Sequence, residues 1–236
     1  MQAVIMAGGA GSRLRPLTNN IPKPMVHIID RPVLELIIRH LKKHSITDIA
    51  MTLGYKADII MNAFGTGENY GVNIRYFIEQ EPLGTAGGVK NAADFIKGDF
   101  IIISGDAVTD IDILDMYRFH KDKNAVITLA SKKVDDVTGM GVIRTDEDGK
   151  VIEFIEKPEH SEEKLVNTGI YIMGKKALRL IPDGFYDFGR NLLPSMKEGL
   201  YAYVTENFWS DIGTLASYYL TNHYVAANPN IFGITL

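Results

Sequence analysis

The chain opens with a short apolar run that leads directly into glycines and fixed positive charges. Gly8, Gly9 and Gly11 lie within four positions, and glycines let backbone N–H groups approach an anion closely and form a concave nest. Arg13 can add a forked contact to phosphate oxygens, and Lys23, held between two prolines, adds a point charge. The segment is therefore predicted to bind phosphate; an ordinary tight turn with solvated arginines is the alternative. Neither a Walker-type loop nor a dinucleotide fingerprint fits the residues that follow these glycines.

Two aspartates from distant parts of the chain are candidates for holding a divalent cation. Asp106 follows the buried run FIIIS, so it is expected at the carboxyl edge of a sheet, near the glycine loop. A carboxylate aimed at phosphate is repulsive unless a cation intervenes, and Mg²⁺ held by one or two carboxylates plus substrate phosphates resolves the conflict. Asp211, in NFWSDIGT, is the second candidate ligand. The alternatives are an Asx-turn at Asp106 and a helix cap at Asp211.

Two further segments offer polar groups for the rest of a ligand. In EQEPLGTAGG, Gly84 lets the backbone approach a flat ligand, and Gln80 and Thr85 offer hydrogen bonds. A helix N-terminus capped by Thr85 is the alternative there. In FIEKP, Lys157 could hold a second phosphate and Glu156 could accept hydrogen bonds from sugar hydroxyls. The alternative is a pair of solvated charges at a strand end.

Composition excludes several other chemistries. The 236 residues include no cysteine, which excludes disulfides, thiolate metal sites and Cys nucleophiles. The net charge of −4 argues against nucleic acid or an anionic membrane as a partner. No G-x-S-x-G stretch occurs. His40 and His44, which flank Lys42 and Lys43, and His120, which precedes Lys121, are expected on solvated faces. Because the N-terminus lacks a signal peptide pattern and the apolar runs are short, a cytoplasmic protein is expected.

Alternating strands and helices must position these candidates. Apolar runs that read as strands alternate with amphipathic segments that read as helices through residue 130, which predicts βαβ units and a mostly parallel sheet. The strands are expected over 3–7, 48–53, 73–79, 99–104 and 125–131, and helices over 31–44, 56–64 and 111–123. A Gly-rich turn at 84–88 is expected to lead into a further helix that ends at Phe95. One α/β domain over 1–236 is the simplest interpretation.

The pattern becomes more antiparallel after residue 130. A hairpin is expected over 139–158, followed by a strand over 166–173 and a helix over 187–199. A strand over 200–209 and a closing helix over 214–228 complete the prediction. The second half is therefore expected to pack on the first without separating from it.

Seven segments taken together resemble the sugar-1-phosphate nucleotidyltransferase family. In chain order they are GGAGSRLRPLT, PKPM, EPLGTAGG, GDAVTD, EKP, NTGIY and WSDIGT. The resemblance implies a Rossmann-like, three-layer αβα fold with a mixed, mostly parallel central sheet. It implies a nucleotide-binding half over about 1–130 and a sugar-binding half over about 131–236. Many relatives carry a C-terminal left-handed β-helix, and none is expected here.

The resemblance also implies a reaction and a role for each matching residue. A nucleoside triphosphate and a sugar 1-phosphate would give a nucleotide sugar and pyrophosphate, with Mg²⁺ as cofactor; a homo-oligomer is left open. Catalytic roles are implied for Arg13 and Lys23, and metal binding for Asp106 and Asp211. The nucleotide-binding set is Ala7, Gly8, Gly9, Gly11, Ser12, Gln80, Gly84 and Thr85. The set around the sugar phosphate is Gly141, Glu156, Lys157 and Asn167.

The implied reaction needs no general base, because a phosphate oxygen is already ionised at neutral pH. This agrees with the lack of a His or Cys nucleophile.

EPLGTAGG is most similar to the segment of enzymes that form GDP-mannose or GDP-heptose, so guanylyl transfer to mannose 1-phosphate is predicted. Uridylyl or thymidylyl transfer to glucose 1-phosphate and guanylyl transfer to heptose 1-phosphate are the alternatives. A non-catalytic regulatory subunit that binds nucleotide sugar, or a transferase that activates choline phosphate, would belong to another class.

Overall fold

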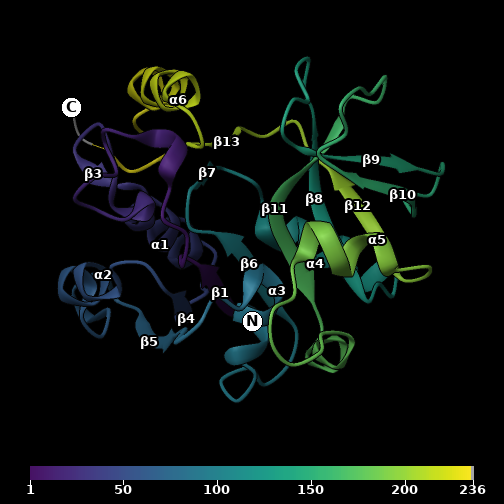
Figure 1. The fold of residues 1–236 in the computed structure, drawn as a ribbon, viewed down its shortest axis with the longest axis horizontal. Coiled ribbons are helices and arrows are strands. Elements are labelled where there is room, and N and C mark those ends of the chain that lie inside the picture. The colour runs from purple at the N-terminus through teal and green to yellow at the C-terminus, as the bar shows by residue number, and fades with distance from the viewer. Residues whose placement is uncertain (235–236) are drawn as a thin grey trace.

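A computed structural model describes residues 1–234 as an α/β fold built around one large mixed sheet (Figure 1). The strands of this sheet are β1 (Gln2–Met6), β4 (Asp48–Leu53), β5 (Asn73–Ile78), β6 (Phe100–Ser104), β8 (Ile127–Lys133), β9 (Gly141–Thr145), β10 (Val151–Glu156), β11 (Leu165–Met173) and β12 (Leu200–Val204). Two small ribbons pair β2 (His27–Ile28) with β3 (Arg31–Pro32) and β7 (Ala107–Thr109) with β13 (Trp209–Asp211). The helices are α1 (Val33–Lys43), α2 (Ala57–Phe64), α3 (Gly84–Asn91), α4 (Ile113–Asp122), α5 (Leu193–Ser195) and α6 (Leu215–Ala227).

The strand order joins the two halves of the chain into one sheet. The order is β10-β9-β11-β6-β1-β4-β5, with β8 paired to β11 and β12 paired to β8. Strands β6, β1, β4 and β5 run parallel, whereas β11 runs antiparallel to β6 and carries the second half. The predicted mixed, mostly parallel α/β fold is confirmed. The central strands β1, β4 and β6 are largely apolar because both of their faces are covered, whereas the edge strand β5 alternates exposed and half-buried residues.

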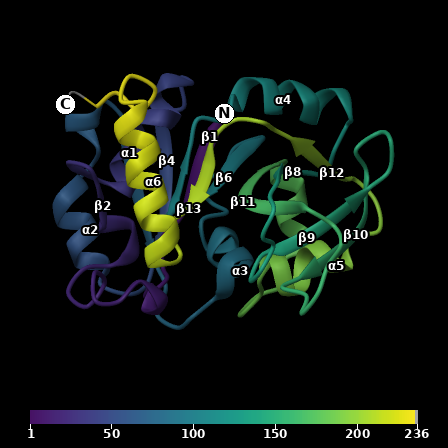
Figure 2. The ribbon, with the colours of Figure 1, turned by 90° about the horizontal axis from the view of Figure 1, so that it is seen from above.

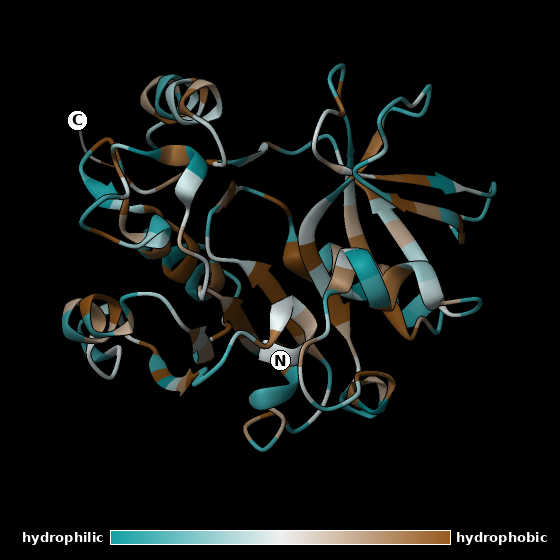
Figure 3. Cartoon of the chain, viewed as in Figure 1, coloured by the Kyte–Doolittle hydropathy of each residue, from teal (hydrophilic) through white to brown (hydrophobic). Residues whose placement is uncertain are grey.

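Helices cover both faces of the sheet. Side chains alternate along β1, so Ile5 packs into the core under α1, α2 and α4, and Val4 packs into the core under α3 and α5. Figure 2 shows α4 and α3 on opposite sides of the sheet. Apolar residues concentrate in the central strands and polar residues in the outer loops (Figure 3). No helix within residues 1–234 is long and apolar enough to cross a membrane.

Two predicted elements of the second half are shorter than expected. The helix predicted over 187–199 is a π-helical turn, Phe188–Leu192, that continues into the short helix α5 and ends before Met196. The strand predicted over 200–209 is wrong as one element, because it is divided into β12 and β13 by a linker of four residues.

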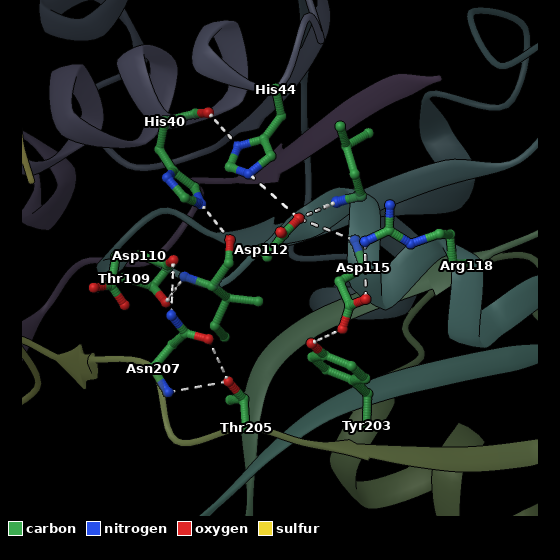
Figure 4. Close-up of polar contacts among 12 residues, drawn as sticks. His40, His44, Thr109, Asp110, Asp112, Asp115, Arg118, Tyr203, Thr205 and Asn207 are labelled. Carbon is green, nitrogen blue, oxygen red and sulfur yellow. Dashed lines mark hydrogen bonds and ion pairs between the residues drawn. The ribbon is translucent and has the colours of Figure 1, made fainter.

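Side-chain hydrogen bonds hold that linker (Figure 4). An oxygen of the Asp110 carboxylate accepts a hydrogen bond from the Phe208 N–H at 2.7 Å, and the Asn207 side chain donates to the Asp110 carbonyl at 3.3 Å. The Thr205 hydroxyl also donates to the Asn207 side chain at 2.9 Å. These contacts turn the chain away from β12, so that β13 pairs with β7 and not with the main sheet.

The histidines expected on solvated faces are partly or fully buried. His40 donates from Nε2 to the Ile111 carbonyl at 3.0 Å, and burial together with the nearby charge of His44 lowers the pKa of His40 to about 4. His44 lies 3.8 Å from Asp112, the residue that caps α4 (Figure 4). His120 is buried and bonds to a threonine hydroxyl. The prediction was wrong because α1 and α4 turn these faces toward other elements and not toward water.

Candidate active site

A cavity of about 450 Å³ lies at the carboxyl edge of the parallel strands. Its lining includes Ala7, Gly8 and Gly9 after β1, together with Gly84 and Thr85 at the start of α3, all five from the predicted nucleotide-binding set. Lys23 and Asp106 also line it. Open α/β sheets bind ligands at this edge, and the fold therefore brings most of the predicted phosphate-binding residues to one place.

The glycine loop is open on one side and packed against Lys23 on the other. A side chain added at Gly9 would meet nothing within 4 Å. Gly11 has a left-handed backbone (φ +63°), and a Cβ atom there would lie 2.7 Å from the Cβ of Lys23. The Thr18 hydroxyl donates a hydrogen bond to the Gly11 carbonyl at 2.8 Å. Glycine is needed at position 11 both for the turn and for the approach of Lys23.

Lys23 forms an ion pair with Asp106 within the cavity. The two side chains are 12% and 18% exposed, respectively, so this contact is screened from water. Burial favours the neutral form of Asp106, but the charge and hydrogen bond of Lys23, with a further hydrogen bond from Ser104, outweigh it and hold the pKa of Asp106 below its ordinary value. The carboxylate of Asp106 accepts hydrogen bonds from the side chains of Lys23 and Ser104, and it does not form the alternative Asx-turn.

Asp211 lies beside Asp106 although 105 positions separate them in sequence. Strand β13 runs antiparallel to β7 with Asp211 opposite Ala107, and the Ile212 N–H donates to the Asp106 carbonyl at 3.1 Å. Burial, and next the negative charge of Asp106, raise the pKa of Asp211 above its ordinary value, while Lys23 and Arg13 act in the opposite direction. The two carboxylates therefore interact electrostatically in the same region.

The carboxylate of Asp211 is available for a ligand. Helix α6 is capped by Thr214 in a capping box with Ser217, so Asp211 is not its cap. The hydrogen bond from Gly213 N–H to Asp211 is long, at 3.4 Å. Within residues 1–234 no group of three or more His, Cys, Asp or Glu side chains could hold a metal alone. Two neighbouring carboxylates beside a phosphate site fit Mg²⁺, which completes its coordination with phosphate oxygens and water.

The predicted sugar-side residues meet on strands β9 to β11. Glu156 pairs with Gly141 across β10 and β9, and a Cβ atom at Gly141 would lie 2.9 Å from the Glu156 carboxylate. Lys157 Nζ lies 3.2 Å from the Glu156 carboxylate, and the Lys157 backbone is left-handed at φ +49°. The side chain of Asn167 donates to the Tyr171 hydroxyl at 2.8 Å. This group lies on the second half of the sheet and outside the lining of the 450 Å³ cavity.

Five residues of the predicted catalytic, nucleotide-binding and metal-binding sets do not line the cavity: Gly11, Ser12, Arg13, Gln80 and Asp211. Ser12 and Arg13 are exposed on the turn after the glycine loop, and Gln80 is exposed beyond the end of β5. Glu79, the neighbour of Gln80, is half-buried and lines the cavity. Burial raises the pKa of Glu79, whose carboxylate accepts one hydrogen bond, at 3.1 Å, from the Leu83 N–H. Side chains alternate along β5, so Glu79 and Gln80 point to opposite faces, but only the folded structure shows which face carries the cavity.

A glycine loop, a lysine and two neighbouring aspartates at the carboxyl edge of a parallel sheet define an α/β protein with a site suited to phosphate-bearing ligands. The model of the nucleotidyl transferase family matches residues 2–228. The chain belongs to this family, that of the sugar-1-phosphate nucleotidyltransferases.

The names of individual relatives point to different nucleotides. A UTP–glucose-1-phosphate uridylyltransferase of Synechocystis sp. is 35% identical over 93% of this chain and 62% of its own length. A D-glycero-alpha-D-manno-heptose 1-phosphate guanylyltransferase of Campylobacter jejuni is 35% identical over 97% of this chain and 100% of its own. The crystal structure of HddC from Yersinia pseudotuberculosis complexed with GMP-PN superposes with a TM-score of 0.82 and 32% identity, covering 94% of this chain and 98% of that one.

The chain matches only part of several curated relatives. It spans about 61–62% of the length of the Synechocystis uridylyltransferase and of several mannose-1-phosphate guanylyltransferases.

Proposed function

We propose that this protein transfers a guanylyl group from GTP to a sugar 1-phosphate of manno configuration, giving a GDP-sugar and pyrophosphate. Mannose 1-phosphate is the proposed acceptor. An ionised oxygen of the sugar phosphate forms a bond to the α-phosphorus of GTP. The bond from that phosphorus to the β-phosphate oxygen breaks, and its electron pair leaves with pyrophosphate. No proton has to be removed from the nucleophile.

The main task of the protein in this reaction is to bring two anions together. Lys23 is proposed to bind phosphate at the reaction centre, and Arg13 to contact the triphosphate from the rim of the site. Asp106 and Asp211 would hold Mg²⁺, which when bound supplies positive charge against the phosphates. Positioning and charge neutralisation are the principal sources of rate in such transfers. Lys157 and Glu156 are proposed to bind the phosphate and the hydroxyls of the sugar.

The assignment of guanine as the base rests on one observation: the carboxylate of Glu79 lies in the cavity wall. An ionised carboxylate only accepts hydrogen bonds, and this half-buried one has a single N–H partner. Guanine presents two adjacent donors, N1–H and the N2 amino group, along one edge. Uracil and thymine present one donor between two carbonyl oxygens, which a carboxylate repels. Adenine and cytosine each present an acceptor beside their amino group.

The manno configuration is supported by the full-length match to the Campylobacter jejuni guanylyltransferase, whose named substrate is a manno-heptose 1-phosphate. Mannose shares the ring configuration of that sugar. Heptose 1-phosphate is therefore the second candidate acceptor for the same reaction. Uridylyl transfer to glucose 1-phosphate is the competing reaction, favoured by the identity to the Synechocystis protein.

A pyrophosphate-release screen tests the proposal. GTP, UTP, dTTP and ATP are each combined with the 1-phosphates of mannose, manno-heptose, glucose and N-acetylglucosamine in the presence of Mg²⁺. GTP with a manno-configured acceptor is expected to give the highest kcat/KM. The highest kcat/KM with UTP and glucose 1-phosphate would contradict the guanine assignment, and no release from any pair would contradict the reaction itself.

A further inference from the structure

The segment 184–191 contacts the nucleotide side of the site through its backbone. The Tyr186 carbonyl accepts hydrogen bonds from the N–H groups of Ala86 at 3.0 Å and Gly87 at 2.9 Å, and the Tyr186 N–H donates to the Leu83 carbonyl at 2.8 Å. A Cβ atom at Gly84 would lie 2.6 Å from the Tyr186 carbonyl oxygen. The start of α3, which lines the cavity, is therefore bonded to a segment about 100 positions later in the chain.

The side chain of Asp187 forms a second connection between the same two segments. The Thr85 hydroxyl donates to Asp187 Oδ2 at 2.8 Å and accepts from the Phe188 N–H at 2.9 Å. Asp187 Oδ1 accepts from the N–H groups of Gly189 at 3.0 Å and Arg190 at 3.2 Å, which caps the π-helical turn. Both Thr85 and Asp187 line the cavity. One carboxylate thus joins the cavity wall at Thr85 to the backbone of residues 189 and 190.

The residues that Asp187 holds contact the sugar side. A Cβ atom at Gly189 would lie 2.4 Å from the Glu156 carboxylate, so Gly189 packs directly against Glu156. The ring of Phe188 stacks on Tyr171 with a centroid distance of 4.6 Å, and the Tyr171 hydroxyl accepts the hydrogen bond of Asn167. A shift of the turn at 188–190 would therefore reach Glu156 and Asn167.

We propose that Asp187 is a positioning residue that couples nucleotide binding to sugar 1-phosphate binding. The inference rests on the proposed reaction, in which the two substrates occupy the two sides of one site. A nucleotide that packs against Thr85 holds the Thr85–Asp187 contact in place, and that contact holds Gly189 against Glu156. Each substrate therefore raises the affinity for the other, and the factor is the same in both directions because coupling free energies are reciprocal.

A double-mutant cycle tests this coupling in the whole protein. Thr85→Val removes the hydroxyl at nearly constant shape, and Asp187→Asn replaces the oxygen that accepts from it. The affinity for a non-reactive α,β-methylene analogue of GTP is measured with and without mannose 1-phosphate, and the ratio of the two is the coupling factor. Asp183→Asn is the matched control, because the 97% exposed side chain of Asp183 pairs with Lys90 of α3 at 2.7 Å, whereas Thr85 bonds to Asp187. This control removes a different polar contact between the same two segments.

The wild-type coupling factor is expected to be about five, which is the size of one modest hydrogen bond, and to fall to about one in each variant. The double variant should match the single ones, because both substitutions break the same contact. Thr85→Ser should restore the coupling, and the KM of mannose 1-phosphate should rise more than kcat falls. Asp183→Asn should behave as wild type.

A wild-type factor of one, additive effects of the two substitutions, or an equal loss in Asp183→Asn would overturn the inference. The proposed function fails separately, through the absence of pyrophosphate release in the wild-type protein. The binding measurement does not need turnover, so the two failures are distinguishable.

Discussion

Replacing Glu79 by glutamine changes one acceptor atom of the cavity wall into a donor without changing the size of the side chain. The Glu79 carboxylate is half-buried and accepts one backbone hydrogen bond. Guanine would offer it two more. In Glu79→Gln one of these hydrogen bonds is lost, and the new amide N–H faces the N–H of the base.

The magnitude follows from the kind of bond that is lost. A hydrogen bond to a charged group contributes about 1.5–3 kcal/mol, and a buried donor left without a partner costs about 1–3 kcal/mol. A combined loss of about 3 kcal/mol corresponds to about a 100-fold fall in kcat/KM with GTP, at roughly 1.4 kcal/mol for each factor of ten. With UTP the change has the opposite sign, because the amide can donate to a carbonyl oxygen and accept from N3–H of uracil.

Steady-state pyrophosphate release with GTP and UTP at several concentrations measures both effects. The ratio of kcat/KM for GTP to that for UTP should fall by at least two orders of magnitude in Glu79→Gln. Glu81→Gln is the control, because Glu81 is exposed and lies outside the cavity lining. A ratio that stays within twofold of wild type in Glu79→Gln would refute the assignment of the base to this carboxylate.

Three other substitutions test other parts of the structure. Gly11→Ala should lower kcat/KM at least tenfold with a near-normal KM for the sugar phosphate. The added methyl group would lie 2.7 Å from the Cβ of Lys23, so it displaces Lys23, and it strains a left-handed turn. An unchanged kcat/KM would contradict the role of Lys23. Asp211→Asn should abolish the Mg²⁺-dependent change in fluorescence of Trp209, the single tryptophan, which lies on the same strand; a wild-type titration curve in the variant excludes Asp211 as a ligand. Burial lowers the pKa of His40 to about 4 in the folded protein, whereas this imidazole has its ordinary pKa of about 6.5 in the unfolded chain. As the pH falls from 6.5 to 4, the unfolded chain is protonated at His40 first, so the free energy of unfolding decreases by about 3 kcal/mol. Denaturant unfolding of His40→Gln should show a pH dependence smaller by that amount, and equal curves would show that His40 does not titrate in this way.

Much of the fold could be read from local patterns. The strand at 48–53 has the predicted bounds, and α1 begins two residues after the predicted start and ends one residue before the predicted end. A continuous apolar run or an amphipathic period is a property of neighbouring residues, so the sequence alone carries it. The glycine loop and Asp106, the second residue after β6, are likewise expected at the carboxyl edge, because a parallel strand order brings strand ends together.

The long-range contacts could not be read in this way. The side-chain contacts of Asp110 with the 205–208 linker divided one predicted strand into two, and this break brings Asp211 beside Asp106. The choice of Glu79 over Gln80 also required the folded cavity.

The sequence by itself determined the α/β class, the position of the glycine loop and the residue types that a phosphate site requires, because each of these depends on short stretches of chain. The tertiary structure alone decided which carboxylates meet, which of two adjacent side chains faces the ligand cavity, and that Asp187 joins the two sides of the site. These contacts connect residues about 100 positions apart. Their formation depends on how helices and strands pack in space, and packing of distant segments leaves no regular period in the sequence.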